Sequence, residues 1–294
     1  MTELKHEKAA LIVGGTGKTG RRVADRLTAR GLPVRVGSRS GEPPFDWNDR
    51  ATWAPALRGM HAAYVTYYPD LAVPGAADTV GAFADLAVDR GVRRLVLLSG
   101  RGEAEAQRAE QRVQESGADW TILRSSWFSQ NFSESFFLES VLSGEIAVPA
   151  GNVGEPFTDV DDIADAAVAA LTEDGHTRQL YELTGPRLLT FAEAAEEIAT
   201  ATGRDIYHVP VTIEHFTAGL ADGGVPDDIV DLLAYLFTEV LDGRNAHVTD
   251  GVQRALGRQP RDFSDYARAA ARTGVWTVGR GAVTGHAPVE HADV

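Results

Sequence analysis

A glycine-rich stretch near the start of the chain has the residue types of a phosphate-binding turn. Residues 11–22 read LIVGGTGKTGRR. A nucleotide-triphosphate loop ending in Gly-Lys-Thr at 17–19 would need a further glycine at position 12, where the chain has Ile12. Glycines at 14, 17 and 20 instead fit a dinucleotide turn, in which a helix N-terminus faces a pyrophosphate. A glycine turn without a ligand is the alternative. The residues predicted to hold the cofactor here are Gly14, Thr16, Gly17, Lys18, Thr19 and Gly20.

The segment after the second expected strand discriminates between the two nicotinamide dinucleotides. NAD sites place an acidic side chain there, which binds the ribose 2′-hydroxyl. Residues 32–41 contain no acidic residue, and Ser38, Arg39 and Ser40 offer hydroxyls and a guanidinium suited to a 2′-phosphate. Lys18 could add a second cation. We therefore predict NADP(H) rather than NAD(H); the alternative is that Arg39 is an ordinary surface arginine.

Further cofactor contacts are expected along the same edge of the sheet, where open α/β folds bind ligands. Asp46 and Trp47 are expected to flank the adenine, although Trp47 could equally belong to the core. Two other expected strands end nearby and supply the remaining predicted cofactor contacts, which are Thr66, Tyr67, Ser99 and Gly100.

The elements that must position these residues alternate between strand and helix. Short apolar runs predict strands at 9–14, 32–37, 62–66, 94–99 and 120–124. Helical patterns follow at 18–30, 75–90 and 103–116. Strands that are apolar throughout and separated by helices indicate a parallel sheet covered on both faces. The predicted class is α/β, with a doubly wound parallel Rossmann sheet and a smaller, mainly helical C-terminal lobe.

The pattern changes after about residue 130, where aromatic residues crowd 127–137. Helices are expected at 131–142, 160–172, 190–202, 213–221, 227–241 and 262–273, with strands near 179–183 and 206–209. We predict a core at 1–130 with returning segments near 145–185, a substrate-covering lobe at 131–276, and a loose tail at 277–294.

Composition excludes several classes of protein. The chain of 294 residues has no cysteine, which excludes disulfides and thiol chemistry and fits a cytoplasmic protein. Its formal charge of -14 disfavours nucleic acid as a partner. Apolar runs are too short to span a membrane, and the charged N-terminus lacks the apolar centre of a secretion signal. We expect a monomer or homodimer that acts on a small molecule.

Several stretches resemble the NmrA-like, atypical short-chain dehydrogenase/reductases. They are the glycine turn, RLVLLSG at 94–100, DWTILR at 119–124, FSQNF at 128–132 and FTDVDDIA at 157–164. The resemblance runs from about residue 9 to about residue 275. It implies a Rossmann sheet, NADP(H) binding and a substrate cleft between sheet and lobe. Members of this family include reductases of quinones, aromatic and carbonyl compounds, and cofactor-binding redox sensors without turnover.

The proton-donating pair usual in these enzymes is missing from this chain. A tyrosine and a lysine four residues later normally protonate the oxyanion that hydride addition leaves. If Glu110 is the glutamate that often follows that lysine, the resemblance puts the pair at Gly102 and Ala106. Ser99 remains as a candidate catalytic residue, or it only closes its strand. The best replacement donor is a tyrosine from the group 64–68, with Tyr67 preferred.

A second polar and aromatic cluster, at 124–132, is expected to leave a strand at the same sheet edge and to form a pocket for a flat organic molecule. Its phenylalanines could instead be core residues. Arg101 could reach a substrate anion or be solvated. The predicted substrate pocket comprises Tyr68, Arg101, Ser126, Trp127, Phe128, Gln130 and Asn131.

No metal site is predicted. The acidic residues Asp159, Asp161, Asp162 and Asp165 lie at an expected helix start, where carboxylates stabilise the helix dipole. The histidines have no ligand spacing. The leading functional hypothesis is an NADPH-dependent reductase of a small aromatic, quinone or carbonyl substrate. The alternative is a non-catalytic NADP(H)-binding redox sensor that acts through a protein partner.

Overall fold

The computed structural model describes residues 9–278, which divide into two compact units. The sheet unit contains the residues up to Ser125 together with Val160–Leu183 and Thr249–Gln259. The helical unit contains Ser126–Asp159, Thr184–Val248 and the residues from Pro260 onward. The return at Thr249–Gln259 is not among the segments that the sequence led us to expect in the core. All but the first two residues of the predicted tail, 277–294, lie outside the described residues.

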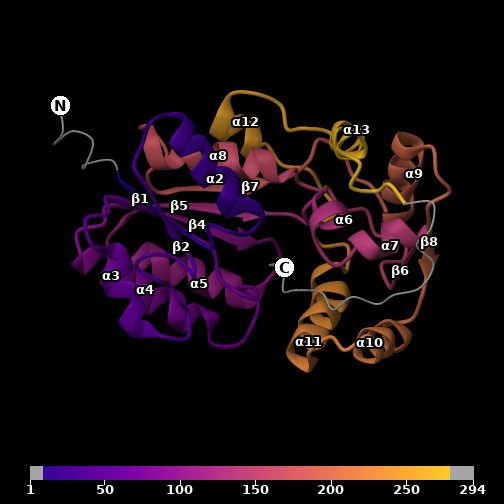
Figure 1. Ribbon diagram of the computed structural model, residues 1–294, viewed down its shortest axis with the longest axis horizontal. Coiled ribbons are helices and arrows are strands. Elements are labelled where there is room, and N and C mark those ends of the chain that lie inside the picture. Colours follow the sequence, from indigo (N-terminus) through magenta and orange to yellow (C-terminus); the bar gives the residue numbers. More distant parts are fainter. Residues whose placement is uncertain (1–8, 279–294) are drawn as a thin grey trace. The chain divides into compact units, whose positions relative to one another are not determined.

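The sheet unit is built on six parallel strands in the order β2-β1-β3-β4-β5-β7 (Figure 1). The strands are β1 (Ala10–Val13), β2 (Val34–Gly37), β3 (Ala62–Val65), β4 (Arg94–Gly100), β5 (Asp119–Ser125) and β7 (Gln179–Leu183). This arrangement confirms the predicted α/β fold with a doubly wound parallel sheet. Because every strand runs the same way, the loops that follow the strands meet at one edge, where such sheets bind ligands.

Helices cover both faces of this sheet. On one side lie α2 (Lys18–Ala29), α8 (Val160–Thr172) and α12 (Gly251–Leu256), and on the other α3 (Trp53–Leu57), α4 (Ala76–Asp89) and α5 (Ala104–Glu115) (Figure 1). Every residue of β1 and β3 is buried, which explains why these strands are apolar throughout. The apolar core beneath α3, α4 and α5 includes Leu11, Phe83 and Leu95.

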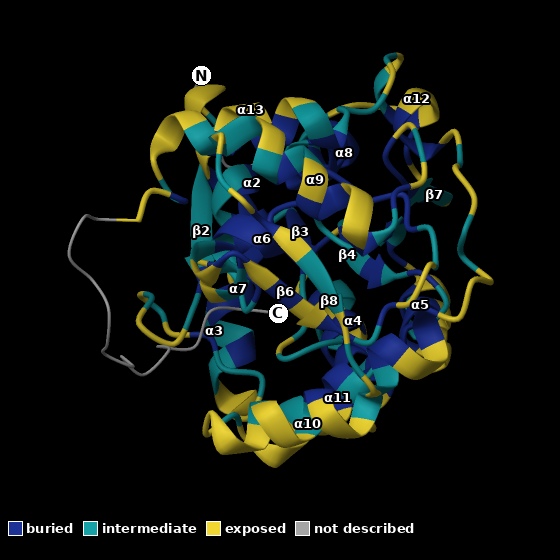
Figure 2. Cartoon of the chain, turned by 90° about the vertical axis from the view of Figure 1, so that its right-hand side faces the viewer, coloured by how far each residue is buried: buried dark blue, intermediate teal, exposed yellow. Residues whose placement is uncertain are grey.

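The helical unit combines short helices with a two-stranded parallel sheet. Its helices are α6 (Asn131–Glu134), α7 (Leu138–Ser143), α9 (Phe191–Thr202), α10 (Ile213–Asp222), α11 (Asp227–Tyr235) and α13 (Phe263–Thr273), and its strands are β6 (Glu145–Val148) and β8 (Tyr207–Pro210). A π-helical turn, Leu236–Val240, continues α11. Aromatic rings fill the core: Phe132 lies 5.1 Å from Phe137 and Phe157 lies 5.3 Å from Phe191 between ring centres. By contrast most of α10 is exposed or half-buried (Figure 2). Phe216 is its one buried residue.

The expected single helix over 131–142 is wrong. Ser135 adopts an extended conformation (φ −152°, ψ −162°) that separates α6 from α7. Three short elements, α3, α12 and β6, were not expected at all. Each spans six residues or fewer, which is too short for a periodic pattern to stand out from its surroundings.

Candidate nucleotide-binding site

The glycine turn after β1 is a close-packed structure that larger residues cannot form. Gly14 has φ +67°, and a Cβ atom there would overlap the Thr66 hydroxyl oxygen, which is held by its hydrogen bond to the Val13 carbonyl (3.1 Å). A Cβ atom on Gly20 would overlap the Gly14 carbonyl. The turn closes with a hydrogen bond from the Gly17 amide to the Gly14 carbonyl (2.9 Å). The glycines thus bring β1, the turn and α2 into contact, as a dinucleotide site requires.

The N-terminus of α2 supplies the electrostatics of this cradle. Gly17 is the N-cap residue, so no side chain caps the helix, and its first turn contains no acidic residue. Backbone N–H groups at such an end carry a partial positive charge suited to a diphosphate. The residues present therefore fit a dinucleotide. Thr16 is exposed and Thr19 is buried. Lys18 is only 5% exposed, and its predicted second contact with a 2′-phosphate stays a prediction.

The loop after β2 is tied directly to the glycine turn. Gly37 is the last residue of β2. Its carbonyl accepts hydrogen bonds from the amides of both Gly14 (3.0 Å) and Gly15 (3.4 Å). Beyond it the chain turns back, because the Phe45 amide donates to the Ser38 carbonyl (2.8 Å). Arg39 and Ser40 are exposed at the tip of this turn. A guanidinium is thus presented beside the cradle, at the edge where the sequence predicts the ribose.

Trp47 lies within an aromatic cluster rather than on an open surface. Its ring centre is 5.0 Å from Tyr67 and 5.3 Å from Phe83, and its indole N–H donates to the Thr66 carbonyl (3.1 Å). The neighbouring Asp46 accepts from Asn48 and Trp53. Both Trp47 and Tyr67 pack against the core. These contacts favour the core alternative for Trp47, and adenine contact by Asp46 and Trp47 stays a prediction.

The candidate tyrosines differ in their access to solvent. Tyr68 is 40% exposed, whereas Tyr64 is fully buried, and burial raises the pKa of its phenol. Tyr67, the preferred proton donor, holds its ring against Trp47. Its catalytic role stays a prediction, as does cofactor contact by Thr66 and Gly100.

Ser99 belongs to an ion network across three neighbouring strands. Ser99, Arg124 and Glu182 lie side by side in the register of β4, β5 and β7. The Ser99 hydroxyl donates to Glu110 (2.6 Å), and Arg124 binds both Glu110 oxygens (2.9 and 2.5 Å) and Glu182 (2.9 Å). The hydrogen bond with Glu110 is the main cause that raises the pKa of Arg124. These bonds favour the alternative in which Ser99 stabilises the end of its strand.

Arg101 is not a solvated loop residue. It is 4% exposed, and its guanidinium lies 3.7 Å from Glu182. The ion network therefore holds two arginines and two glutamates at the carboxyl ends of β4, β5 and β7. Sequence reasoning considered Ser99, Arg101 and Glu110 singly and missed this arrangement. The available signal was Arg124, an arginine within a predicted strand, where a buried charge needs a partner.

The predicted pocket residues of the helical unit are held by a short bridge to residues 157–159. Phe128 pairs with Thr158, and the Thr158 amide donates to the Trp127 carbonyl (2.8 Å). Gln130 donates to Asp159 (2.8 Å), and the half-buried Trp127 ring lies 4.9 Å from Phe237. Ser126 and Asn131 are buried. Tyr68 and Arg101 belong to the sheet unit, so the convergence of all seven residues on one pocket stays a prediction.

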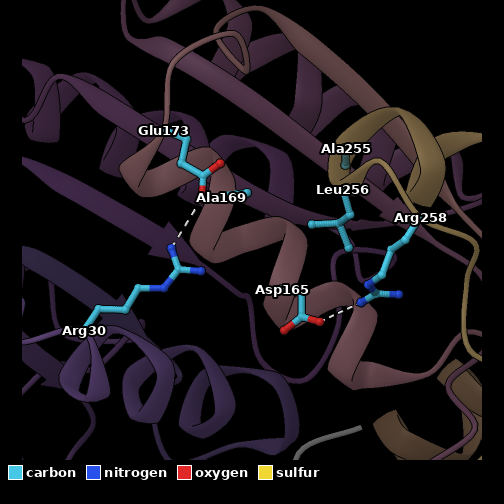
Figure 3. Close-up of a pocket in the computed structure, with 7 residues that line it drawn as sticks. All are labelled: Arg30, Asp165, Ala169, Glu173, Ala255, Leu256 and Arg258. Carbon is cyan, nitrogen blue, oxygen red and sulfur yellow. Dashed lines mark hydrogen bonds and ion pairs between the residues drawn. The ribbon is translucent and has the colours of Figure 1, made fainter.

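An open pocket of about 470 Å³ lies on the α2, α8 and α12 side of the sheet unit (Figure 3). Its charged residues neutralise each other: Arg30 lies 3.4 Å from Glu173, and Arg258 lies 2.6 Å from Asp165. Arg30 follows the C-terminal end of α2, whereas the glycine turn precedes its N-terminus. This pocket is therefore not the dinucleotide cradle, and it offers no unbalanced charge to a ligand.

The acidic residues at the start of α8 form ion pairs. Arg26 lies 2.5 Å from Asp161, and Arg258 lies 2.7 Å from Asp162. Among residues 9–278 there is no group of three or more His, Cys, Asp or Glu residues that could hold a metal. The same part of the chain contains no helix long and apolar enough to cross a membrane.

Comparison with known proteins identifies the family. Residues 14–174 match a family described as NAD(P)H-binding. The chain belongs to this NAD(P)H-binding family. Two curated relatives match this chain over nearly its whole length. The oxidoreductase YesF of Bacillus subtilis is 34% identical over 281 residues, covering 91% of this chain and 97% of YesF. The NAD(P)H azoreductase of Xenophilus azovorans is 30% identical over 283 residues, covering 89% and 97%.

Solved structures share the fold of this NAD(P)H-binding protein at lower identity. The NADPH-dependent quinone oxidoreductase of Escherichia coli, complexed with NADPH, superposes with a TM-score of 0.71 at 22% identity, covering 89% of this chain and 99% of the other. Nmra, a negative transcriptional regulator solved with NAD, gives 0.68 at 16% identity, covering 90% and 96%. The NAD(P)H-binding oxidoreductase family that the sequence resemblance implies is confirmed, and by family the chain is an NAD(P)H-dependent oxidoreductase. The likeness to Nmra is one of fold.

Proposed function

We propose that this oxidoreductase uses NADPH to reduce a small, flat aromatic, quinone or carbonyl substrate. The observation that carries the cofactor preference is the exposed Arg39, on a loop tied to the glycine turn and free of acidic residues from 32 to 41. A guanidinium at this place favours a 2′-phosphate and gives a 2′-hydroxyl no acidic partner. The substrate class is supported by the names of the azoreductase relative and the quinone oxidoreductase neighbour.

The chain's own residues would bind and orient the cofactor. The glycine turn and the first N–H groups of α2 would hold the diphosphate, and Arg39 with Ser38 and Ser40 the 2′-phosphate. When bound, the nicotinamide supplies a hydride. A proton must still reach the reduced substrate, and the resemblance puts Gly102 and Ala106 at the positions of the usual tyrosine and lysine. Quinones tolerate this loss because water can protonate their reduced form.

The test is a comparison of binding with turnover. NADPH and NADH affinities are measured by quenching of tryptophan fluorescence, and NADPH oxidation is followed by the loss of its absorbance with a panel of quinones, azo dyes and carbonyl compounds. The proposal expects tighter binding of NADPH than of NADH, and oxidation with at least one acceptor. Equal affinities would refute the cofactor preference, and no oxidation across the panel would refute the reductase.

A redox sensor is the second candidate, because the chain lacks the tyrosine–lysine pair and shares its fold with the regulator Nmra. Its net charge of -14 favours a protein rather than a nucleic acid as the partner. A sensor would bind its protein partner with different affinity in the NADP⁺-bound and NADPH-bound forms, and it would show no turnover. A partner retained on the immobilised protein with only one cofactor form would support it.

A further inference from the structure

The loop that presents Arg39 is attached to the rest of the sheet unit at both of its limbs. The outgoing limb leaves β2 at Gly37, whose carbonyl accepts an amide of the glycine turn (3.0 Å). The returning limb, residues 45–47, is attached through Trp47, whose indole N–H donates to the Thr66 carbonyl (3.1 Å). Arg39 is exposed at the tip between these two attachments. The position of its guanidinium therefore depends on both of them.

Thr66 connects the second attachment to the glycine turn. Its hydroxyl donates to the Val13 carbonyl (3.1 Å), and a Cβ atom on Gly14 would overlap that hydroxyl oxygen. A hydroxyl has one hydrogen, and this bond uses it. Trp47, Thr66 and Val13 thus form a chain of hydrogen bonds from the returning limb to the end of β1. Together with the attachment of the outgoing limb, this chain closes a ring that includes the glycine turn.

Packing fixes the Trp47 ring in the orientation that this bond needs. Its ring centre lies 5.1 Å from Phe45, 5.7 Å from Trp53 and 5.3 Å from Phe83. Phe45 is buried, and its amide donates to the Ser38 carbonyl (2.8 Å), which joins the returning limb to the outgoing one. Because rings surround the indole on several sides, its N–H keeps its direction toward the end of β3.

The hydrogen bond is the part of this arrangement that requires a tryptophan. The sequence gave Trp47 two alternative roles, adenine contact and core packing, and neither of them uses the indole N–H. A phenylalanine would pack in the same aromatic cluster, whereas its ring has no N–H to donate. In a Trp47→Phe variant the Thr66 carbonyl would therefore lose its indole donor, while the surrounding rings keep an aromatic neighbour.

We propose that Trp47 is a positioning residue for cofactor selection, whose indole N–H holds the returning limb so that Arg39 meets the 2′-phosphate of NADPH. The proposal rests on the cofactor preference proposed above. Arg39 makes the contact that discriminates between the cofactors, and Trp47 acts through it. NADH has no 2′-phosphate and gains nothing from the position of this guanidinium, so the effect of Trp47 is confined to NADPH.

The first test measures the Kd of both cofactors by calorimetry in Trp47→Phe and in the control Trp120→Phe. Trp120 packs against the same apolar core, but from β5. We expect NADPH to bind about tenfold more weakly to Trp47→Phe, because a hydrogen bond is lost and a carbonyl is left without its donor, whereas NADH affinity stays unchanged. Trp120→Phe should change neither affinity. An unchanged ratio of the two Kd values in Trp47→Phe, or an equal loss for both cofactors, would overturn the proposal.

A double-mutant cycle tests whether Trp47 acts through Arg39. Once Arg39→Ala has removed the guanidinium, the further change Trp47→Phe should cause no additional loss of NADPH affinity. Losses that add in the double variant would mean that Trp47 contributes independently of Arg39, and they would overturn the positioning role.

Thr66 gives a second test, which does not depend on the folding of Trp47→Phe. Thr66→Ala removes the hydroxyl that binds Val13, and both cofactors use the glycine turn, so both should bind more weakly by a similar factor. Thr66→Ser keeps the hydroxyl and should bind both normally. Undiminished binding in Thr66→Ala would overturn the proposed ring.

The unmutated protein separates this proposal from the one on which it rests. Equal affinities for NADPH and NADH would refute the cofactor preference, and with it the role of Trp47. A preference for NADPH that survives in Trp47→Phe would refute the role of Trp47 alone.

Discussion

Arg124 binds the Glu110 carboxylate through two hydrogen bonds, 2.9 and 2.5 Å long, donated by two nitrogens of its guanidinium. Glu110 is 3% exposed, so Arg124 rather than water surrounds its carboxylate. We expect Arg124→Leu to destabilise the protein by about 3–5 kcal/mol, because a buried carboxylate loses its counter-ion. Urea unfolding followed by circular dichroism measures the loss.

The double variant Arg124→Leu, Glu110→Leu serves as the control for that prediction. Removing both charges leaves Glu182 with Arg101 and no buried carboxylate at position 110 without its partner, so it should recover part of the stability. A double variant less stable than Arg124→Leu would contradict the assignment of the loss to an unpaired charge, and would point instead to lost packing around Ser99 and Glu182.

Gly14 should tolerate no side chain. In Gly14→Ala the new methyl group meets the Thr66 hydroxyl, and the positive φ costs an L-residue about 1–2 kcal/mol. We expect lower thermal stability and at least tenfold weaker NADPH binding, measured by calorimetry. Gly59→Ala is a matched control, since Gly59 also has positive φ but faces open space. Equal effects on cofactor binding in the two variants would contradict a role for the turn in binding.

Arg39 should discriminate between the two dinucleotides. Removing a charge-assisted hydrogen bond costs about 1.5–3 kcal/mol, so Arg39→Ala should weaken NADPH binding about tenfold to a hundredfold and leave NADH binding unchanged. Arg90→Ala is the control, because Arg90 is equally exposed but follows the C-terminal end of α4. A parallel loss for both cofactors would place Arg39 outside the 2′-phosphate site.

Glu103 should make stability depend on pH. An acid whose pKa is raised on folding stabilises the native state most below its unfolded pKa, near 4.3, and loses that contribution as pH rises toward the folded value. The pKa of Glu103 is raised chiefly by burial. Urea midpoints of Glu103→Gln should therefore rise relative to the unmutated protein between about pH 5 and pH 8. Parallel profiles over this range would mean that Glu103 ionises normally in the folded chain.

Much of the sheet unit could be predicted from local patterns. Strands β1 and β3 are buried throughout, so each is a short apolar run, and the glycine turn has a spacing that only a few backbone arrangements use. Local sequence patterns do not predict which side chains from distant segments form a pair. Glu110 and Arg124 are separated along the chain, and nothing in either segment shows that they share a hydrogen bond.

The helical unit was harder to predict, because its aromatic residues pack in a hydrophobic core and the sequence alone does not separate such residues from those of a ligand pocket. Phe132 was a candidate for either a core or a pocket, and it is fully buried, with its ring centre 5.1 Å from that of Phe137. An aromatic residue has the same signature in sequence whether it contacts a ligand or another ring. The break at Ser135 has no glycine or proline to mark it anywhere in residues 131–142.

The sheet unit is assembled from segments that are far apart in the sequence, so it cannot be completed until the last of them has been synthesised. Strand β7 and helix α12 come from the returns at Val160–Leu183 and Thr249–Gln259. Within α12 a Cβ atom on Gly251 would overlap the Glu182 carbonyl, and the Thr249 hydroxyl donates to the same carbonyl. The ribosome must therefore release residue 259 before β7 gains this support. Until then the nascent chain exposes an edge strand of a parallel sheet, a species for which chaperones provide protection.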